Sequence, residues 1–277
     1  MNFFRDYKLQ KWVRSPAWFL GFAAISIVLL AVYGLNMLLA DVAPGSAWGL
    51  TYGTMAALLL LGAALYGVRR RRLRYNVGRS HTWVQFHVYG GTVFLLLVFM
   101  HSGFHVPSGS LTWWLWFFSI WITISGLGGI GLQKWIPRIL TSGLAVEVVY
   151  ERIPELVIEI RKRAERVIAT CTDPVKNFYQ KDLAPALAAP QTRLIYYFDI
   201  TGGSQMRTRQ FEYLRRFLSS EERENLDNLE SIYKTKLELD AHYTLQKALR
   251  WWLYAHLPVS LILVVLLALH LYSVFYY

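Results

Sequence analysis

The feature that most constrains this chain is a set of five long apolar runs that contain no lysine or arginine. Each run has about 20 residues or more, which is the length that a helix needs to cross the hydrocarbon core of a bilayer. The runs are 17–40, 47–68, 82–106, 111–132 and 251–277. We therefore predict an all-α fold, an integral membrane helical bundle with five transmembrane helices in contact with the lipid bilayer.

The composition of the chain supports this class. Of its 277 residues, 55% are hydrophobic and only 17% are charged, whereas a soluble domain has about 25% charged residues. The net charge of +11 does not indicate a nucleic-acid partner, because a basic nucleic-acid binder lacks such an apolar majority. A disulfide scaffold is excluded because Cys171 is the only cysteine.

The distribution of the basic residues predicts an orientation. All 29 lie in three blocks, 1–16, 69–79 and 133–250. Five spans threaded in order bring these blocks to one side of the membrane, which the positive-inside rule assigns to the cytoplasm. We expect a cytoplasmic N-terminus, an external C-terminus and a location in the bacterial inner membrane. The run 17–40 is longer than the core of a cleaved signal peptide, so we expect it to be retained.

Three segments follow from this topology. Residues 1–132 form transmembrane helices 1–4, residues 133–250 form a cytoplasmic and mostly helical insertion, and residues 251–277 form transmembrane helix 5, which completes the bundle.

Within the insertion, apolar residues from Val146 to Val167 recur at steps of three and four residues, which predicts an amphipathic helix interrupted or kinked near Pro154. Residues 194–200 are predicted to form a short strand. Ser219 or Ser220, followed by two glutamates, is predicted to begin a helix that runs through Asp240 and can continue into the last span.

Four of the seven histidines lie in the apolar cores of two of the runs: His87 and His101 in the third, His256 and His270 in the fifth. Ionisable residues in a membrane are costly and usually mark a functional site. Both pairs are 14 residues apart, so each helix advances about 21 Å between its histidines and returns to within about 40° of the same face.

The predicted topology makes the third and fifth spans parallel. His87 then matches His256 in depth, and His101 matches His270. Facing imidazoles at two depths are what two stacked, bis-histidine haems require. A single buried histidine would more often be a hydrogen-bonded core residue, and zinc or copper are alternative metals, although a structural zinc site gathers three or four ligands at one point.

The two His-x13-His motifs resemble those of two-haem b-type cytochromes, both the respiratory cytochrome b core and the membrane domain of ferric reductases and NADPH oxidases. The resemblance covers the second to fifth spans and implies that His87, His101, His256 and His270 are the axial ligands of two haem b groups. Attachment is expected to be non-covalent because no Cys-x-x-Cys-His motif occurs. The sequence departs from both groups: it contains no sixth span, no flavin and nicotinamide domain and no quinol-site sequence of respiratory cytochrome b, and the insertion matches neither.

Small and cationic residues near the histidines are further cofactor-binding candidates. A haem face needs small residues, and the candidates are Gly90, Gly91, Gly126 and Gly129. Small residues also let membrane helices approach one another, which is the alternative reading. The pattern G-x-G-x-x-G at Gly126 follows no strand, so we reject a dinucleotide site.

Arg79 and Arg250 lie outside His87 and His256 in sequence and are candidates for contacts to haem propionates, or are ordinary cytoplasmic charges. His105 follows His101 by four residues. We consider three roles for it: an alternative ligand, a proton acceptor or a quinol contact.

These observations predict a di-haem cytochrome b subunit that carries electrons across the membrane, between a redox partner or the quinone pool and a partner on the other face. No catalytic residues for bond chemistry are evident. We expect an electron-transfer subunit of a larger oxidoreductase, with an external cytochrome or iron-sulfur protein and a cytoplasmic subunit at 133–250 as partners, and no nucleic acid. A self-contained quinol or ferric reductase and a histidine-based metal transporter stay open.

Overall fold

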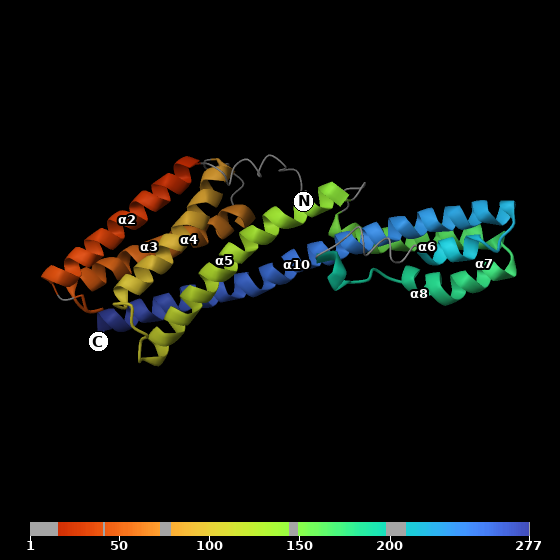
Figure 1. Ribbon diagram of the computed structural model, residues 1–277. Coiled ribbons are helices and arrows are strands. Elements are labelled where there is room, and N and C mark those ends of the chain that lie inside the picture. The colour runs from red at the N-terminus through yellow and green to blue at the C-terminus, as the bar shows by residue number, and fades with distance from the viewer. Residues whose placement is uncertain (1–15, 41, 73–78, 144–148, 198–208, 277) are drawn as a thin grey trace. The chain divides into compact units, whose positions relative to one another are not determined.

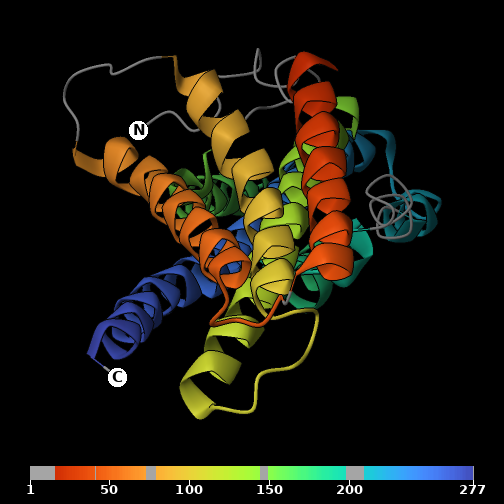
Figure 2. The same ribbon diagram turned by 90° about the vertical axis from the view of Figure 1, so that its left-hand side faces the viewer.

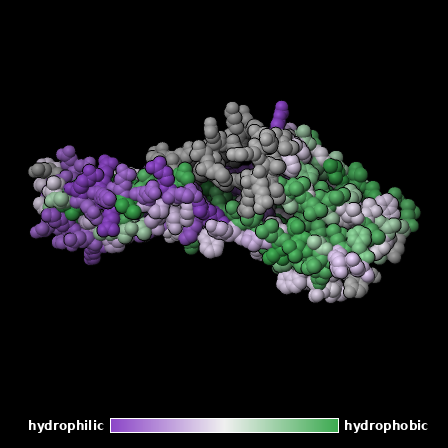
Figure 3. Space-filling view, turned by 180° about the vertical axis from the view of Figure 1, so that it is seen from behind, coloured by the Kyte–Doolittle hydropathy of each residue, from purple (hydrophilic) through white to green (hydrophobic). Residues whose placement is uncertain are grey.

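The computed structural model of the chain describes residues 16–40, 42–72, 79–143, 149–197 and 209–276. Within these ranges every regular element is a helix, and no strand occurs. The chain divides into two compact units, one made of Met1–Gly131 with Trp252–Tyr277 and the other of Leu132–Trp251. We call them the apolar unit and the charged unit, because Figure 3 shows the surface of the first largely hydrophobic and that of the second largely hydrophilic.

Among the described residues, five helices are long and apolar enough to cross a membrane, as the sequence predicts. They are α2 (Pro16–Leu39), α3 (Ala47–Arg72), α4 (Ser80–His101), α5 (Ser110–Gly143) and α10 (Ser220–Tyr276). The all-α prediction is therefore confirmed for the described part of the chain, and these helices are compatible with an integral membrane protein.

Helix α4 lies at the centre of the apolar unit and packs against both α2 and α3 (Figures 1 and 2). The buried core that joins the helices includes Tyr52 of α3, Leu97 and Met100 of α4, and Leu263 of α10. The α2–α3 and α4–α5 connections lie at the same end of this unit, where their residues line a common cavity. We call this the loop end.

Helix α4 ends at His101, five residues before the end of the predicted run 82–106. The backbone turns sharply there because Gly103 and Phe104 have φ values of 61° and 58°, which lie outside the α-helical region. The amide of Phe104 donates to the carbonyl of Phe99 at 2.8 Å and closes the end of the helix. His101 is thus held by the last turn of α4, and His105 lies in the loop.

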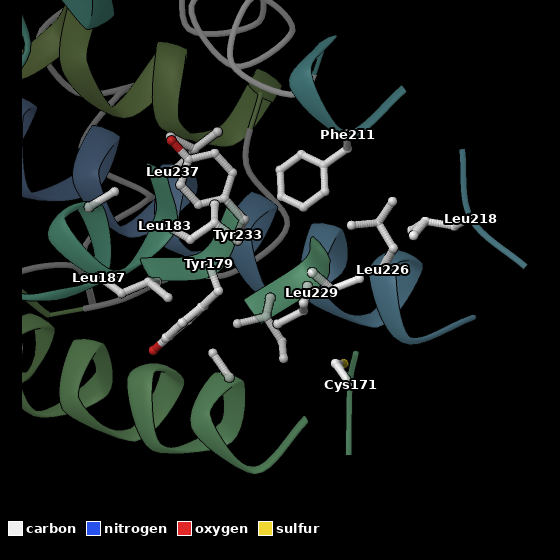
Figure 4. Packing of buried hydrophobic residues seen from close by; sticks show 14 residues of the cluster. Cys171, Tyr179, Leu183, Leu187, Phe211, Leu218, Leu226, Leu229, Tyr233 and Leu237 are labelled. Carbon is white, nitrogen blue, oxygen red and sulfur yellow. The ribbon is translucent and has the colours of Figure 1, made fainter. Parts of the chain in front are cut away.

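The charged unit packs short helices against the first half of α10. These are α6 (Ile153–Ala169), α7 (Asp173–Phe178), a π-helical turn (Tyr179–Leu183), α8 (Ala184–Leu187) and residues 209–215. Figure 4 shows their shared core, in which Phe211 and Leu226 are fully buried beside Tyr233. The predicted helical character of this segment is seen throughout its regular elements.

The predicted amphipathic helix is present, but the role of Pro154 was wrong. A 3-10 turn (Tyr150–Arg152) leads into α6, and Pro154 lies in the first turn of that helix. Proline is favoured at this position because the first amides of a helix have no intrahelical acceptor. The buried face carries Val157 and Ala164, whereas Val146 lies outside the described residues.

The predicted strand at 194–200 was also wrong. Residues 194–197 form a 3-10 helix, Leu194–Tyr197, and residues 198–200 lie outside the described residues. The adjoining chain is held by side chains of α10 instead of a neighbouring strand: the amide of Arg193 donates to Thr244 Oγ1 at 3.2 Å, and the amide of Gln191 donates to Asp240 Oδ1 at 2.8 Å. Asp240 also forms a buried ion pair with Lys236, with both Nζ–O distances at 2.7 Å.

Helix α10 runs without interruption for 57 residues, from the charged segment into the last apolar run. Its start is capped reciprocally, because the amide of Glu222 donates to Ser219 Oγ at 3.4 Å and the amide of Ser219 donates to Glu222 Oε2 at 3.3 Å. The predicted helix start and its continuation beyond Asp240 are confirmed.

Candidate functional site

The four membrane histidines form two facing pairs in the apolar unit. The ring centres of His87 on α4 and His256 on α10 are 6.4 Å apart, with an interplanar angle of 67°. Those of His101 and His270 are 6.3 Å apart at 75°. The structure thus brings together the same two pairs that were predicted from the equal spacing of the histidines and the parallel direction of the two helices.

The separation within each pair is compatible with a single shared metal. An imidazole centre lies about 1.1 Å from its own nitrogen, and the metal lies about 2 Å beyond that nitrogen, so two trans ligands have ring centres about 6.2 Å apart. The observed 6.4 Å and 6.3 Å lie close to this value. Edge-to-face contacts between rings also cover this range, so the distance alone does not identify a metal site.

Hydrogen bonds determine which nitrogen of each imidazole is available. His87 Nδ1 is 3.0 Å from the carbonyl oxygen of Ala63, and His101 Nδ1 is 2.8 Å from that of Gly49. A carbonyl accepts only, so both Nδ1 atoms carry the proton and donate it. The lone pair is then on Nε2, the tautomer that metal-ligating histidines adopt with such a partner.

His256 is held in the same way by a side chain of α5. Its Nδ1 lies 2.9 Å from Ser125 Oγ, and the Ser125 hydroxyl donates to the carbonyl of Ile122 at 3.1 Å. Because the hydroxyl proton is used in that bond, Ser125 accepts from Nδ1–H of His256. Three of the four imidazoles therefore have Nδ1 engaged and Nε2 available for a metal.

The two α3 residues whose carbonyls accept from the histidines have the same spacing as the histidines themselves. Gly49 and Ala63 are 14 residues apart, as are His101 and His87, and the two helices run antiparallel, so each carbonyl meets one imidazole. Sequence reasoning missed these acceptors, because a backbone carbonyl leaves no residue-type signal. Their small side chains are the one visible trace, since small residues let an imidazole reach a helix backbone.

Gly53 was also missed, and it is the glycine nearest to any of the four rings. A Cβ at this position would lie 2.8 Å from His101 Nδ1 and 2.9 Å from Cε1, closer than any real Cβ contact. The His101 ring therefore occupies the space that a side chain would fill. Gly126, a predicted candidate, is less restricted, because its Cβ would be 3.4 Å from His256 Cε1.

The other predicted glycines have different surroundings. The indole of Trp252 covers Gly129, where a Cβ would lie 2.0 Å from its ring. Trp252 Nε1 donates to the carbonyl of Ser125 at 2.7 Å, and its ring lies 5.4 Å from that of His256. Gly129 thus admits the indole that supports His256, so its link to a cofactor would be indirect.

Gly90 and Gly91 follow His87 on α4. A Cβ on Gly90 would make ordinary contacts with Phe86, at 3.7 Å, and Leu59, at 3.9 Å, whereas one on Gly91 would meet nothing within 4 Å. Gly91 lies one turn from His87 and has the open surroundings that a cofactor face requires.

The two predicted arginines differ in their contacts. Arg79 is exposed at the start of α4, eight residues before His87. Arg250 belongs to the charged unit, where it forms an ion pair with Glu151 and its guanidinium lies 4.1 Å from the ring centre of Tyr150. Propionate binding by either arginine stays a prediction.

Apolar side chains separate the two histidine levels. Phe94 lies midway between His87 and His101, and Leu263 lies midway between His256 and His270. Their exposed fractions are 4% and 0%, and both belong to the core cluster of the apolar unit. Buried apolar side chains therefore lie between the two levels.

The donor set fits haem better than a protein-only metal site. Within the described ranges, no group of three or more histidine, cysteine, aspartate or glutamate side chains gathers at either level. A structural zinc site takes four such ligands and a catalytic one takes three. Two facing imidazoles at each level would instead fit an iron whose remaining ligands come from a macrocycle.

Comparison with known proteins identified no relative: no family model, no curated protein and no solved structure matches the chain.

Proposed function

We propose that the chain is a membrane-embedded di-haem cytochrome b subunit that carries electrons between the two faces of a membrane. The observation that carries this proposal is the pair of equal imidazole separations, 6.4 Å and 6.3 Å, at two levels of one helix bundle. His87 and His256 would hold one haem b, and His101 and His270 the other. Bound haem b supplies an iron that changes reversibly by one electron.

The residues around each pair act as orienting groups. Ala63, Gly49 and Ser125 hold the imidazoles with Nε2 available and raise their basicity through the Nδ1–H bonds. The restraint on His87, His101 and His256 would limit movement of these ligands when the charge on the iron changes. Such rigidity suits electron transfer, which needs little rearrangement of the site.

The spacing of the levels supports transfer across the bilayer. Fourteen residues of helix correspond to about 21 Å, most of the hydrocarbon core of about 30 Å. One level would therefore lie near each face. We assign the His87 level to the cytoplasmic side and the His101 level to the outside, since the basic residues 69–79 flank the former.

In this proposal the charged unit is cytoplasmic and serves as the binding site for a partner subunit, while an external cytochrome or iron-sulfur protein, or the quinone pool, exchanges electrons at the other level. The location that we propose is the bacterial inner membrane, with the N-terminus in the cytoplasm as the charge pattern favours. The chain would be one subunit of a larger oxidoreductase.

The test is the cofactor content of the purified full chain. We expect about two haem b per chain in a pyridine haemochromogen assay, a reduced-minus-oxidised spectrum of b type, and iron as the only stoichiometric metal. Replacement of all four histidines by alanine should abolish the spectrum. Stoichiometric zinc without a Soret band would contradict the proposal and favour a histidine-based metal transporter.

A further inference from the structure

Helix α5 contacts the His87–His256 level through one residue that binds two side chains of α10. The carbonyl of Ser125 accepts from Trp252 Nε1 at 2.7 Å, and its side-chain oxygen lies 2.9 Å from His256 Nδ1. Trp252 and His256 are one helical turn apart, so their side chains are neighbours, and their ring centres are 5.4 Å apart. Ser125, Trp252 and His256 thus form a closed set of three contacts, which we call the indole clamp.

Gly129 provides the space for the indole on α5. It lies four residues after Ser125, as Trp252 lies four residues before His256, which is the relation expected of two helices that run in opposite directions. A Cβ on Gly129 would overlap the indole ring, so any side chain there would displace Trp252. A Cβ on the neighbouring Gly128 would meet nothing within 4 Å. The close approach of the indole to α5 therefore depends on Gly129.

The facing ring of His87 is held from a different helix. Its Nδ1 donates to the carbonyl of Ala63 on α3 at 3.0 Å, and the ring of Tyr66 lies 5.3 Å away. The χ2 torsion of histidine has a broad energy minimum, so the plane of an imidazole is fixed only when its neighbours hold it. The interplanar angle of 67° between His87 and His256 is thus determined by two independent restraints, one on each ring.

The repeat of 14 residues does not reproduce the indole clamp at the His101–His270 level. The residue 14 positions after Trp252 is Leu266, and the residue 14 positions before Ser125 is Leu111. A leucine side chain neither donates nor accepts a hydrogen bond. The two levels therefore differ in the restraint that α5 places on the imidazole of α10, although the histidines themselves are equally spaced.

We propose that Trp252 is a positioning residue that, together with Ser125, fixes the plane of the His256 imidazole relative to that of His87. This inference rests on the proposed di-haem function and deepens it, because it gives the two levels different restraints. The alternative is a packing role alone, in which Gly129 and Trp252 let α5 and α10 approach one another. Packing affects the whole apolar unit, whereas positioning affects one imidazole, so the two roles can be separated by measurement.

The measurement is the electron paramagnetic resonance spectrum of the oxidised protein, which records the angle between the two axial imidazoles of a ferric haem. Steeply crossed imidazole planes give a highly anisotropic low-spin signal, and parallel planes give a rhombic one. The angles of 67° and 75° predict the highly anisotropic type at both levels. Release of the His256 ring should shift one of the two signals towards the rhombic type and leave the other in place.

The test compares substitutions on both sides of the indole clamp in the purified full chain. Trp252→Leu and Gly129→Ala should each shift the signal that is absent from His87→Ala. Their matched controls, Trp251→Leu and Gly128→Ala, should shift neither signal, because Trp251 is 66% exposed and a Cβ on Gly128 meets nothing within 4 Å. Combination of Gly129→Ala with Trp252→Phe should return the shifted signal towards that of the wild type, since the smaller ring relieves the overlap.

Haem content and thermal stability are measured on each preparation. Selective loss of the haem that His87→Ala also lacks would support positioning in the same way as a shifted signal. Trp252→Leu and Gly129→Ala proteins with two haems and two unchanged signals would overturn this inference alone, and reduced stability in them would show a packing role. Equal shifts of both signals would also overturn it. A wild-type chain without haem would overturn the proposed function and this inference with it.

Discussion

Substitution of Gly53 by alanine should release one haem and leave the other in place. The added methyl group would lie 2.8 Å from His101 Nδ1, whereas ordinary contacts begin near 3.4 Å, so the ring must retreat by about 0.6 Å. Because α3 and α4 are packed against one another, the ring can move only by turning. That rotation lengthens the 2.8 Å bond from Nδ1 to the carbonyl of Gly49.

The cost follows from these two effects. Overpacking of a well-packed site costs about 1–3 kcal/mol, and a weakened hydrogen bond costs about 0.5–1.5 kcal/mol. Their sum corresponds to at least a tenfold loss of affinity at that level. Loss of a partner that orients a metal ligand typically weakens metal binding by about 10–100-fold, and we expect the Gly53→Ala protein to fall within this range.

The assay is the transfer of haem from the detergent-solubilised protein to excess apomyoglobin, followed by the Soret band. In Gly53→Ala, one of two haems should transfer about 10–100 times faster than in the wild type. Gly67→Ala is the matched control on the same helix, since a Cβ there meets nothing within 4 Å. Transfer of both haems at wild-type rates would refute the reasoning, and equal acceleration of both would indicate general unfolding.

Three further predictions concern other residues. Ser125→Ala should weaken the haem of the other level by about 10–100-fold in the same assay, because Nδ1 of His256 loses the acceptor at 2.9 Å. Lys236→Met should lower the free energy of unfolding in denaturant by about 3–5 kcal/mol, because it leaves Asp240 buried without its cation. Addition of Asp240→Leu should restore part of the loss, since the Gln191 amide then also loses its acceptor. Burial raises the pKa of the Cys171 thiol, so iodoacetamide should react with it slowly at mildly alkaline pH until the charged unit unfolds.

Each of these three predictions would be contradicted by one specific result. Loss of the His101-level haem from Ser125→Ala would place Ser125 at the wrong level. A double variant no more stable than Lys236→Met would show that the ion pair is not the source of the effect. Reaction of Cys171 in the folded protein at the rate of a free thiol, with the rate rising through the ordinary thiol pKa, would contradict its burial.

The parts of the fold that depend on local pattern were predictable. Charge-free runs of sufficient length predict the five long helices, and the spacing of His87, His101, His256 and His270 identifies two levels, because helical periodicity is a property of neighbouring residues. The cap at Ser219 and Glu222 is likewise local.

The parts of the fold and of the site that depend on contacts between residues far apart in the sequence were not predictable. Residues 194–197 have strand-like composition, but they form a 3-10 helix, and the chain just before them is held by side chains of α10, which accept from the amides of Gln191 and Arg193. Gly53 on α3 leaves space for the ring of His101, which belongs to α4. Ser125 forms a hydrogen bond with His256, which is 131 residues away in the sequence. No single-chain pattern records such contacts.

The pairing of the histidines is tested most directly by potentiometric titration of four single variants, each with one histidine replaced by alanine. We expect His101→Ala and His270→Ala to lose the same one of two haem midpoint potentials, and His87→Ala and His256→Ala to lose the other. Loss of different components by His101→Ala and His270→Ala, or loss of one component by the two histidines of a single helix, would contradict ligation across α4 and α10.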